Sequence, residues 1–279
     1  MSIMKDINKV NIGKRIYGII ERIHQERPLI HNITNMVAMN DSANIILAVG
    51  GLPVMAHARK EVGEMVKAAG ALVLNIGTLT PEQIESMIIA GKVANSLKIP
   101  VILDPVGAGA TNLRTESSLR LQEKIKINIV RGNFAEISIL AGLKGNIKGV
   151  ESIGTEKNSV EIACSLARKY NQIAIITGKQ DVVTDGKTVI KIDNGSPMLG
   201  TITATGCMVT SLIATFAAVD DEDYLLASTG ALVCFGLAGE RAAVKAQGPG
   251  SFKVNLFDEI YNLNEKIIGE GLKVNIYEL

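Results

Sequence analysis

Residues 71–104 read ALVLNIGTLTPEQIESMIIAGKVANSLKIPVILD, and this stretch identifies the fold class. Residues 71–76 and 100–104 are short, β-rich and mostly apolar runs without polar alternation, which is typical of strands buried on both faces. Between them, Thr80-Pro81-Glu82-Gln83 combines a capping-box pattern with proline at the first helical position, so a helix begins there. The stretch predicts a strand, a helix and a second strand, the unit from which parallel sheets are built.

The same alternation of helix and strand extends in both directions from this stretch. Isoleucines at helical spacing between Ile16 and Ile23 predict a helix near the N-terminus. Further strands are predicted at 29–33, 53–58, 125–130 and 173–177, and further helices at 41–49, at 61–69, after Thr115, after Asn133 and before Asn171. Asp185-Gly186 between β-rich arms predicts a hairpin over 182–192, which could form a sheet edge. We expect an α/β fold with a central, mostly parallel sheet and helices on both faces.

Length and composition favour a single domain over residues 1–279. Hydrophobic residues make up 47% of the chain, which is ample for a sizeable core. The sequence has no fixed-period repeat, and residues 142–156 resemble a polar, glycine-containing loop more than an interdomain linker.

Charge and cysteine content restrict the partners and the compartment. With 29 basic and 28 acidic residues, the chain offers no electrostatic attraction for nucleic acid or an anionic membrane. Residues 1–28 mix charged and apolar positions, so they lack the apolar region of a signal peptide, and the apolar runs at 208–219 and 229–239 are too short to span a membrane. Three widely separated cysteines argue against a disulfide framework. We expect a cytoplasmic protein with a small-molecule ligand.

A cysteine stands where a helix is predicted to begin. Thr205-Gly206-Cys207 precedes the apolar run from Leu212 to Val219. Free backbone N–H groups at a helix start attract phosphate oxygens, and the same field lowers the pKa of a thiol. The position favours phosphoryl transfer; a small core cysteine beside a turn glycine is the alternative. The two common nucleotide-binding fingerprints, G-x-x-x-x-G-K-[ST] and G-x-G-x-x-G, are absent.

Polar residues follow several predicted strands, and open α/β sheets bind ligands at the carboxyl ends of their strands. Asp104 precedes a loop that contains glycines, and Arg131, Asn133 and Glu136 follow the next apolar run. A guanidinium suits phosphate oxygens, and two carboxylates would be enough for a hydrated Mg²⁺. A turn aspartate and a helix N-cap at Asn133 are the alternatives. Residues 31–35, 53–57 and 75–78 could line a substrate pocket, Thr177-Gly178-Lys179 could meet phosphates, and 248–252 could wall an adenosine pocket or form only a loop.

Together these motifs resemble the hydroxyethylthiazole kinase family, in the family's order from about residue 28 to 252. They are Ile33-Thr34-Asn35, Pro53-Val54-Met55-Ala56-His57, Leu74-Asn75-Ile76-Gly77-Thr78-Leu79, Asp104-Pro105-Val106-Gly107, Arg131-Gly132-Asn133-Phe134-Ala135-Glu136 and Thr205-Gly206-Cys207. The resemblance implies a ribokinase-like fold without a separate lid domain, and a homotrimer with its thiazole site at a subunit boundary. The implied reaction is ATP- and Mg²⁺-dependent phosphorylation of the hydroxyl of 4-methyl-5-(2-hydroxyethyl)thiazole, for thiamine salvage.

The resemblance also implies a role for each matching residue. It implies substrate contacts at Met55, Asn35, Gly77, Thr78 and Ala204, ATP-phosphate contacts at Arg131, Thr177, Thr205 and Gly206, magnesium-associated carboxylates at Asp104 and Glu136, and a catalytic Cys207 where related kinases carry an aspartate base. We hypothesise that Cys207 orients the acceptor hydroxyl and modestly assists its deprotonation. Mg²⁺, Arg131 and backbone N–H groups would stabilise the developing charge.

Ala204 departs from the family pattern, which usually has glycine at this position. Its methyl restricts the turn if the backbone φ is positive, and an alanine fits if φ is negative. We expect an active enzyme. The rival interpretations are a hydroxymethylpyrimidine kinase of the same architecture, an NAD(P)H-hydrate dehydratase, which would carry an aspartate after its glycine turn, and a thiazole-binding protein without activity.

Overall fold

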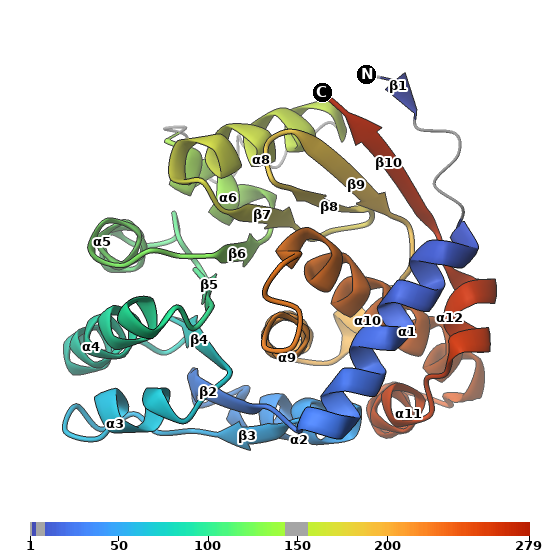
Figure 1. Cartoon of the computed structure of the whole chain (residues 1–279), viewed down its shortest axis with the longest axis horizontal. Helices are drawn as coiled ribbons and strands as arrows, with labels where there is room; N and C mark the ends of the chain where they lie inside the picture. The colour runs from blue at the N-terminus through green and yellow to red at the C-terminus, as the bar shows by residue number, and fades with distance from the viewer. Residues whose placement is uncertain (1, 4–8, 143–155) are drawn as a thin grey trace.

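The computed structural model describes residues 2–3, 9–142 and 156–279 (Figure 1). The strands are β1 (Ser2–Ile3), β2 (Leu29–Ile33), β3 (Leu52–Val54), β4 (Ala71–Asn75), β5 (Val101–Asp104), β6 (Ile129–Gly132), β7 (Ile173–Ile176), β8 (Asp181–Thr184), β9 (Thr188–Ile192) and β10 (Val274–Glu278). They form one sheet in the order β1-β10-β9-β8-β7-β6-β5-β4-β2-β3. All pairings between β3 and β7 are parallel, and those from β7 to β1 are antiparallel. The predicted mostly parallel sheet is confirmed.

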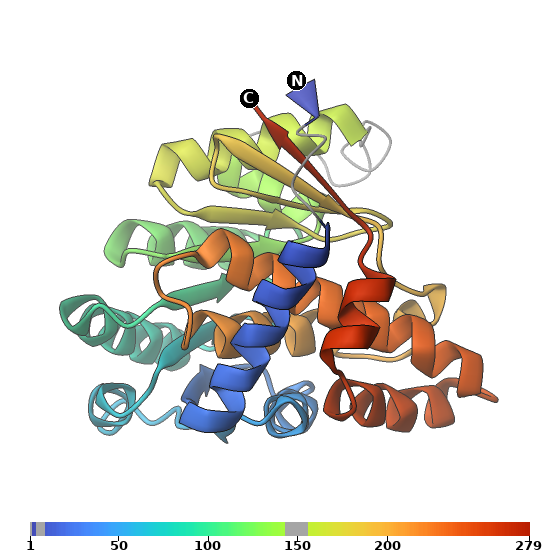
Figure 2. The same ribbon diagram turned by 45° about the vertical axis from the view of Figure 1, so that its right-hand side comes forward.

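Helices cover both faces of this sheet (Figures 1 and 2). They are α1 (Lys9–Glu26), α2 (Met39–Val49), α3 (Val62–Lys67), α4 (Pro81–Leu97), α5 (Asn112–Lys124), α6 (Phe134–Ala141), α8 (Glu156–Tyr170), α9 (Thr205–Ala217), α10 (Tyr224–Lys245), α11 (Pro249–Tyr261) and α12 (Glu265–Gly271), with a short 3-10 helix η1 (Pro197–Thr201). One face packs on α3 to α6 and α8, and the other on α1, α2 and α9 to α12.

Residues of the inner parallel strands β4, β5, β6 and β7 alternate between two apolar cores. In β4, Val73 joins the core on the α9 side, whereas Leu72 and Leu74 join the core on the α4 side. Because both sides of the strand are buried, apolar residues occupy consecutive positions without polar alternation. This burial is the physical origin of the apolar runs in the sequence.

The predicted helix start at Thr80 and the predicted hairpin are confirmed. Thr80 Oγ1 accepts a hydrogen bond from the Gln83 N–H at 3.2 Å, and α4 begins at the following proline. In the turn between β8 and β9, Asp185 Oδ1 accepts the Lys187 and Thr188 N–H groups. The hairpin is not a sheet edge, because β10 pairs with β9 and β1 pairs with β10.

Two predicted strands have wrong boundaries. The strand predicted at 53–58 ends at Val54, because side chains hold the residues that follow: His31 Nε2 donates to the Ala56 carbonyl at 2.8 Å, and His57 lies 3.1 Å from the Thr34 N–H nitrogen. The strand predicted at 125–130 begins only at Ile129, because α5 continues to Lys124 and pairing with β5 starts at Ile129; Ile125 and Ile127 are buried in the α4-side core without strand pairing.

Two predictions on the other segments also need correction. The helix predicted after Thr115 already begins at Asn112. Residues 248–252 are not a loop: α11 begins at Pro249, and Ser251 Oγ accepts the Gln247 and Gly248 N–H groups. Apart from its two end residues, the loop predicted over 142–156 lies outside the described residues.

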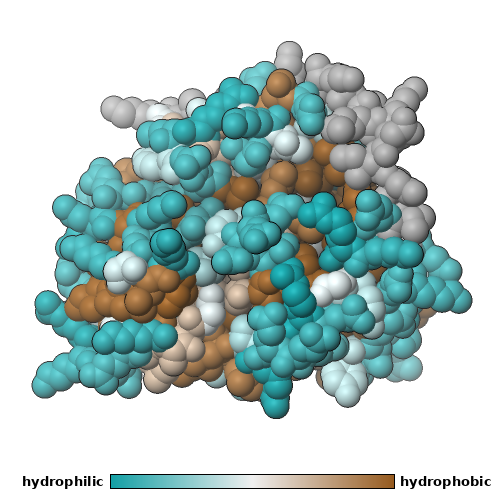
Figure 3. Space-filling model, viewed as in Figure 1, coloured by the Kyte–Doolittle hydropathy of each residue, from teal (hydrophilic) through white to brown (hydrophobic). Residues whose placement is uncertain are grey.

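Hydrophilic side chains cover most of the face shown in Figure 3, with apolar patches between them. Among the residues that the structure describes, no helix is long and apolar enough to cross a membrane.

Candidate active site

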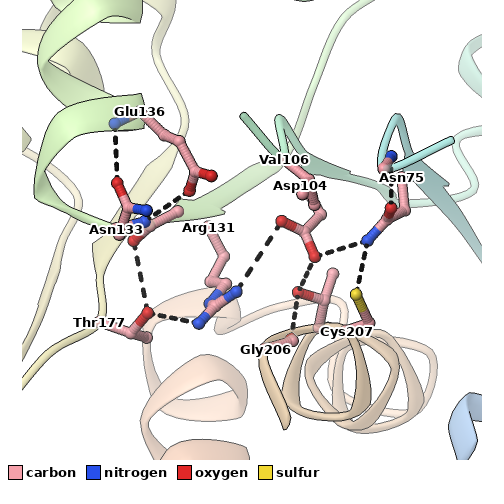
Figure 4. A network of polar contacts seen from close by, with 12 residues as sticks. Asn75, Asp104, Val106, Arg131, Asn133, Glu136, Thr177, Gly206 and Cys207 are labelled. Atoms are coloured by element: carbon pink, nitrogen blue, oxygen red, sulfur yellow. Dashed lines mark hydrogen bonds and ion pairs between the residues drawn. The ribbon is translucent and has the colours of Figure 1, made fainter. Parts of the chain in front are cut away.

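The candidate site lies where the carboxyl ends of the parallel strands face the beginning of α9 (Figure 4). Asn75 and Asp104 are the last residues of β4 and β5, Arg131 lies in β6, and Thr177 follows β7. Thr205, Gly206 and Cys207 form the first turn of α9. The predicted strand-end cluster therefore comes together in space.

Two pockets meet at this edge of the sheet. The larger has a volume of about 750 Å³, and its lining includes Thr177, Gly178, Lys179 and residues 193–197. The smaller has a volume of about 350 Å³, and its lining includes Asn35, Gly77, Thr78, Asp104, Val106, Glu136, Ala204 and Cys207. Both pockets are lined by Arg131, Asn133, Thr205 and Gly206. A group bound at this junction is in contact with both pockets.

Two of the predicted contacts lie outside the pockets of the described chain. Met55 follows the edge strand β3 and lines neither of the two pockets. Residues 248–252, considered as a wall for adenosine, also line neither pocket.

Two asparagine side chains hold the Cys207 sulfur. Asn35 Nδ2 and Asn75 Nδ2 each donate to Cys207 Sγ at 3.2 Å. Asn75 also donates to Asp104 Oδ2 at 2.8 Å, and its Oδ1 accepts from Asn35 Nδ2 and the Gly77 N–H. All four hydrogen-bonding positions of the Asn75 amide are thus used. Because Sγ is the acceptor in both hydrogen bonds, the thiol proton of Cys207 takes part in neither of them.

Burial raises the pKa of Cys207 to about 11, and the nearby Asp104 carboxylate adds to this effect. The two asparagine hydrogen bonds and Arg131 act in the opposite direction but are weaker. The expectation that the helix start lowers this pKa is wrong, because desolvation outweighs the favourable contacts. Cys207 is therefore a protonated thiol at neutral pH.

Asp104 is fully buried and has one unoccupied oxygen. Its Oδ2 accepts hydrogen bonds from Asn75 at 2.8 Å and from Thr210 Oγ1 at 3.0 Å. Its Oδ1 has no hydrogen-bond donor among the described residues, and Arg131 Nη1 lies 3.8 Å away. Burial raises the pKa of Asp104 to about 6, against the attraction of Arg131. The side chain is mostly ionised at neutral pH, with one oxygen available for a cation.

Glu136 and Asn133 form a reciprocal capping box at the start of α6. Asn133 Oδ1 accepts the Glu136 N–H at 2.9 Å, and Glu136 Oε2 accepts the Asn133 N–H at 2.8 Å. The N-cap alternative for Asn133 is confirmed. Glu136 Oε1 also accepts the Gly107 N–H at 2.8 Å. Each carboxylate oxygen keeps a further lone pair on a residue that lines the smaller pocket.

The donor set suits hydrated Mg²⁺ better than a closed metal site. The unpartnered Asp104 Oδ1 and the Glu136 carboxylate supply two anionic ligands at one pocket. Magnesium usually takes one or two carboxylates together with waters and phosphate oxygens. Within residues 2–3, 9–142 and 156–279, no group of three or more His, Cys, Asp or Glu side chains could hold a metal by itself.

The start of α9 and Arg131 form one anion-binding corner. A Cβ at Gly206 would lie 2.6 Å from Arg131 Nη1, so the absence of a side chain lets the guanidinium approach the helix. Arg131 Nη2 donates to Thr177 Oγ1 at 2.5 Å. The first N–H groups of a helix have no acceptor within the helix. Positive charge and free donors therefore converge at the pocket junction.

Ala204 adopts φ 69°, in the left-handed region. Of the two alternatives for this turn, the structure has the positive φ, at which a methyl group is unfavourable.

The sequence predicted Asn75 only as one of residues 75–78 that could line a substrate pocket, and it gave no role to Thr210. The structure instead places Asn75 between Asp104 and Cys207, as a donor to both. Thr210 lies inside an apolar helical run, and nothing in the sequence marks its contact with an aspartate 106 residues away.

The sequence model of the hydroxyethylthiazole kinase family matches residues 20–266. The chain belongs to the hydroxyethylthiazole kinase family. A relative named hydroxyethylthiazole kinase, from Thermoanaerobacter pseudethanolicus, is 57% identical over 258 residues, which are 92% of this chain and 97% of the relative. Membership of a kinase family implies ATP as co-substrate.

Solved structures agree with this assignment. A hydroxyethylthiazole kinase protein from Pyrococcus horikoshii OT3 is 43% identical, with a TM-score of 0.87 over 95% of this chain and 100% of that one. A ribokinase-like superfamily protein from Enterococcus faecalis V583 is 12% identical, with a TM-score of 0.63 over 88% of this chain and 93% of that one, and shares the fold alone. The hydroxyethylthiazole kinase family and the ribokinase-like fold predicted from the motifs are confirmed.

Proposed function

We propose that this chain transfers the γ-phosphoryl group of ATP to the hydroxyl of 4-methyl-5-(2-hydroxyethyl)thiazole, for thiamine salvage. The observation that carries the proposal is the junction of two pockets at Arg131 and Gly206. The larger pocket lies within the usual size range of ligand sites and suits a nucleotide. The smaller pocket, beside Cys207, suits a small alcohol. A terminal phosphate at the junction would face the acceptor.

The chain contributes mainly position and charge to this reaction. The acceptor oxygen forms a bond to the γ-phosphorus, the bond from that phosphorus to ADP breaks, and the hydroxyl proton is released. Little covalent chemistry falls to the protein in such a transfer. Arg131 and the first N–H groups of α9 are placed to stabilise the transferring group, and Thr177 holds the guanidinium.

We propose that Asp104 and Glu136 bind Mg²⁺. When bound, the ion supplies charge neutralisation to the phosphate oxygens. The support is the buried Asp104 Oδ1, which lacks a hydrogen-bond partner, at the pocket that Glu136 also lines.

We propose that Cys207 orients the acceptor hydroxyl and is not its general base, because the thiol is protonated at neutral pH. Cys207→Ala should lower kcat about tenfold, below the range of about 10²–10⁴ that a general base contributes. Asp104→Ala should abolish measurable turnover. Steady-state ADP release measures both. A 10³-fold loss in Cys207→Ala, with a wild-type kcat that rises with pH up to about 11, would assign the base to the thiol.

We propose that the protein is a homotrimer with each thiazole site at a subunit boundary. Val37 lines the smaller pocket and is 62% exposed, and Met36 beside it is 73% exposed. Met55 lines neither pocket of its own chain, so a neighbouring subunit would have to supply it. Sedimentation equilibrium should give three times the chain mass of 29.7 kDa.

The free cysteines of the described chain support the proposal of a cytoplasmic location.

The decisive test is ADP release with ATP and Mg²⁺, with and without the thiazole alcohol, and with hydroxymethylpyrimidine in parallel. Thiazole-dependent ADP together with a phosphorylated thiazole supports the proposal. Turnover of the pyrimidine alone would overturn the substrate assignment. Binding of thiazole without release of ADP would indicate a protein without activity. Ala204, in its left-handed conformation, would then be the first residue to replace with glycine.

A further inference from the structure

Arg114, on α5, donates hydrogen bonds to three backbone carbonyl groups. Its Nη1 bonds to the Val106 carbonyl at 2.7 Å and to the Ile76 carbonyl at 3.2 Å, and its Nη2 bonds to the Gly77 carbonyl at 2.8 Å. No described carboxylate forms a salt bridge with Arg114, so its charge is directed at these carbonyls. Charged donors form stronger hydrogen bonds than neutral ones, and the planar guanidinium fixes their directions.

The three carbonyls belong to two loops of the smaller pocket. The loop at 76–80 follows β4 and supplies Gly77 and Thr78 to the lining, and the loop at 105–111 follows β5 and supplies Val106. We call these two loops the acceptor wall. Arg114 itself lines neither pocket. It therefore holds the acceptor wall from behind and does not face a bound ligand.

The backbone of the second loop is shaped to Arg114. Gly107 has φ 77°, and a Cβ there would lie 2.9 Å from Arg114 Cδ. The Gly107 N–H donates to Glu136 Oε1 at 2.8 Å. The loop is thus held on one side by Arg114, at the Val106 carbonyl, and on the other by Glu136.

We propose that Arg114 is a positioning residue that holds the acceptor wall and thereby sets the affinity and the alignment of the acceptor alcohol. This role rests on the proposed function, since it assigns the smaller pocket to the acceptor. It predicts an effect on one substrate only. The lining of the larger pocket includes the ends of β6 and β7, residues 193–197, 199 and 200, and residues of the helices α9 and α10, and Arg114 hydrogen-bonds to none of these.

The kinetic test compares Arg114→Met with Arg120→Met. Arg120 lies on the same helix, but its guanidinium pairs with Glu85 at 2.6 Å on the surface, so this control removes the same charge without touching the acceptor wall. In Arg114→Met, kcat/KM for the alcohol should fall about 10²-fold, the scale expected for a misplaced substrate, while KM for ATP stays unchanged. Arg114→Lys should recover part of the loss, because an ammonium group can reach only some of the three carbonyls. A KM for ATP that rises as much as the KM for the alcohol would overturn the proposal. An unchanged kcat/KM for the alcohol would also overturn it.

A second readout needs no turnover. Hydrogen–deuterium exchange should be faster in peptides that cover 76–80 and 105–111 in Arg114→Met than in Arg120→Met, with residues 193–200 unchanged. If the wild-type protein does not phosphorylate the thiazole, the proposed function fails, and the exchange data still report on Arg114. Equal exchange in the two variants would overturn its role whatever the substrate.

Discussion

Ala204 occupies a backbone conformation that favours glycine, directly before the helix that carries Cys207. Glycine adopts φ 69° without the steric cost of a Cβ, but it gains more freedom in the unfolded chain. We expect Ala204→Gly to raise the free energy of unfolding by about 0.5–1 kcal/mol, measured by denaturant titration. Ala243→Gly, in the right-handed helix α10, should instead lower it by about 1 kcal/mol. A loss of stability in both variants would contradict the left-handed turn.

Asp104 makes stability depend on pH because its pKa differs between the two states. The value is raised from 3.8 to about 6 on folding, so the folded protein binds this proton more tightly. The resulting stabilisation is present below about pH 4 and is lost as pH rises through about 6. Asp104→Asn does not titrate. Its free energy of unfolding relative to wild type should therefore rise by on the order of 2–3 kcal/mol between about pH 4 and pH 7.

Urea unfolding of both proteins at the two pH values measures this difference. A stability difference that does not change with pH would mean that Asp104 keeps its ordinary pKa. Asp104→Asn should also lose phosphoryl transfer, because the substitution removes the anionic oxygen that faces the proposed metal.

At the scale of the element, the capping box of α6 links helix stability to the candidate metal site. Asn133→Ala removes the acceptor for the Glu136 N–H and should lower the free energy of unfolding by about 1 kcal/mol. Asn264 caps α12 in the same way, through the Ile267 N–H, but lies outside the site, so Asn264→Ala is the matched control. Only Asn133→Ala should raise the Mg²⁺ concentration needed for half-maximal activity, by about tenfold. If both variants need the same Mg²⁺ concentration for half-maximal activity, the capping box of α6 does not support the metal site.

Element types were easier to predict than element ends. The apolar run at 125–130 is buried as expected, yet β6 begins only at Ile129, because burial on one core does not require pairing in the ladder. The strand predicted at 53–58 stops early because His31 binds the Ala56 carbonyl and the His57 side chain binds the Thr34 backbone, so side-chain contacts replace strand pairing there. Local composition records burial, and it does not record which partner satisfies a backbone group.

At the scale of the whole molecule, one sheet carries both apolar cores, and we propose that the chain unfolds as a single domain. Strands such as β4 place alternate residues in each core, so neither core can open without disrupting the other. Calorimetry should show one transition whose calorimetric and van't Hoff enthalpies agree. Two resolved transitions would instead indicate two domains.

The sequence by itself determined the α/β class, the helix start at Thr80 and the strand-end positions of Asp104 and Arg131. Apolar runs, the capping residues at Thr80 and polar residues directly after apolar runs indicate these features. Each of these signals lies within a few consecutive residues and can be read without the tertiary structure. The family followed from the order of such motifs.

Only the tertiary structure decided the protonation of the Cys207 thiol, the positive φ of Ala204 and the hydrogen bonds of Arg114 to the acceptor wall. Asn75 and Cys207 are 132 residues apart in the chain, and their contact exists only because β4 and α9 pack together. The field of a helix start is local and could be anticipated, whereas the desolvation that overrides it at Cys207 is the sum of all surrounding atoms. Burial of that kind depends on the packing of distant segments, which no local pattern contains.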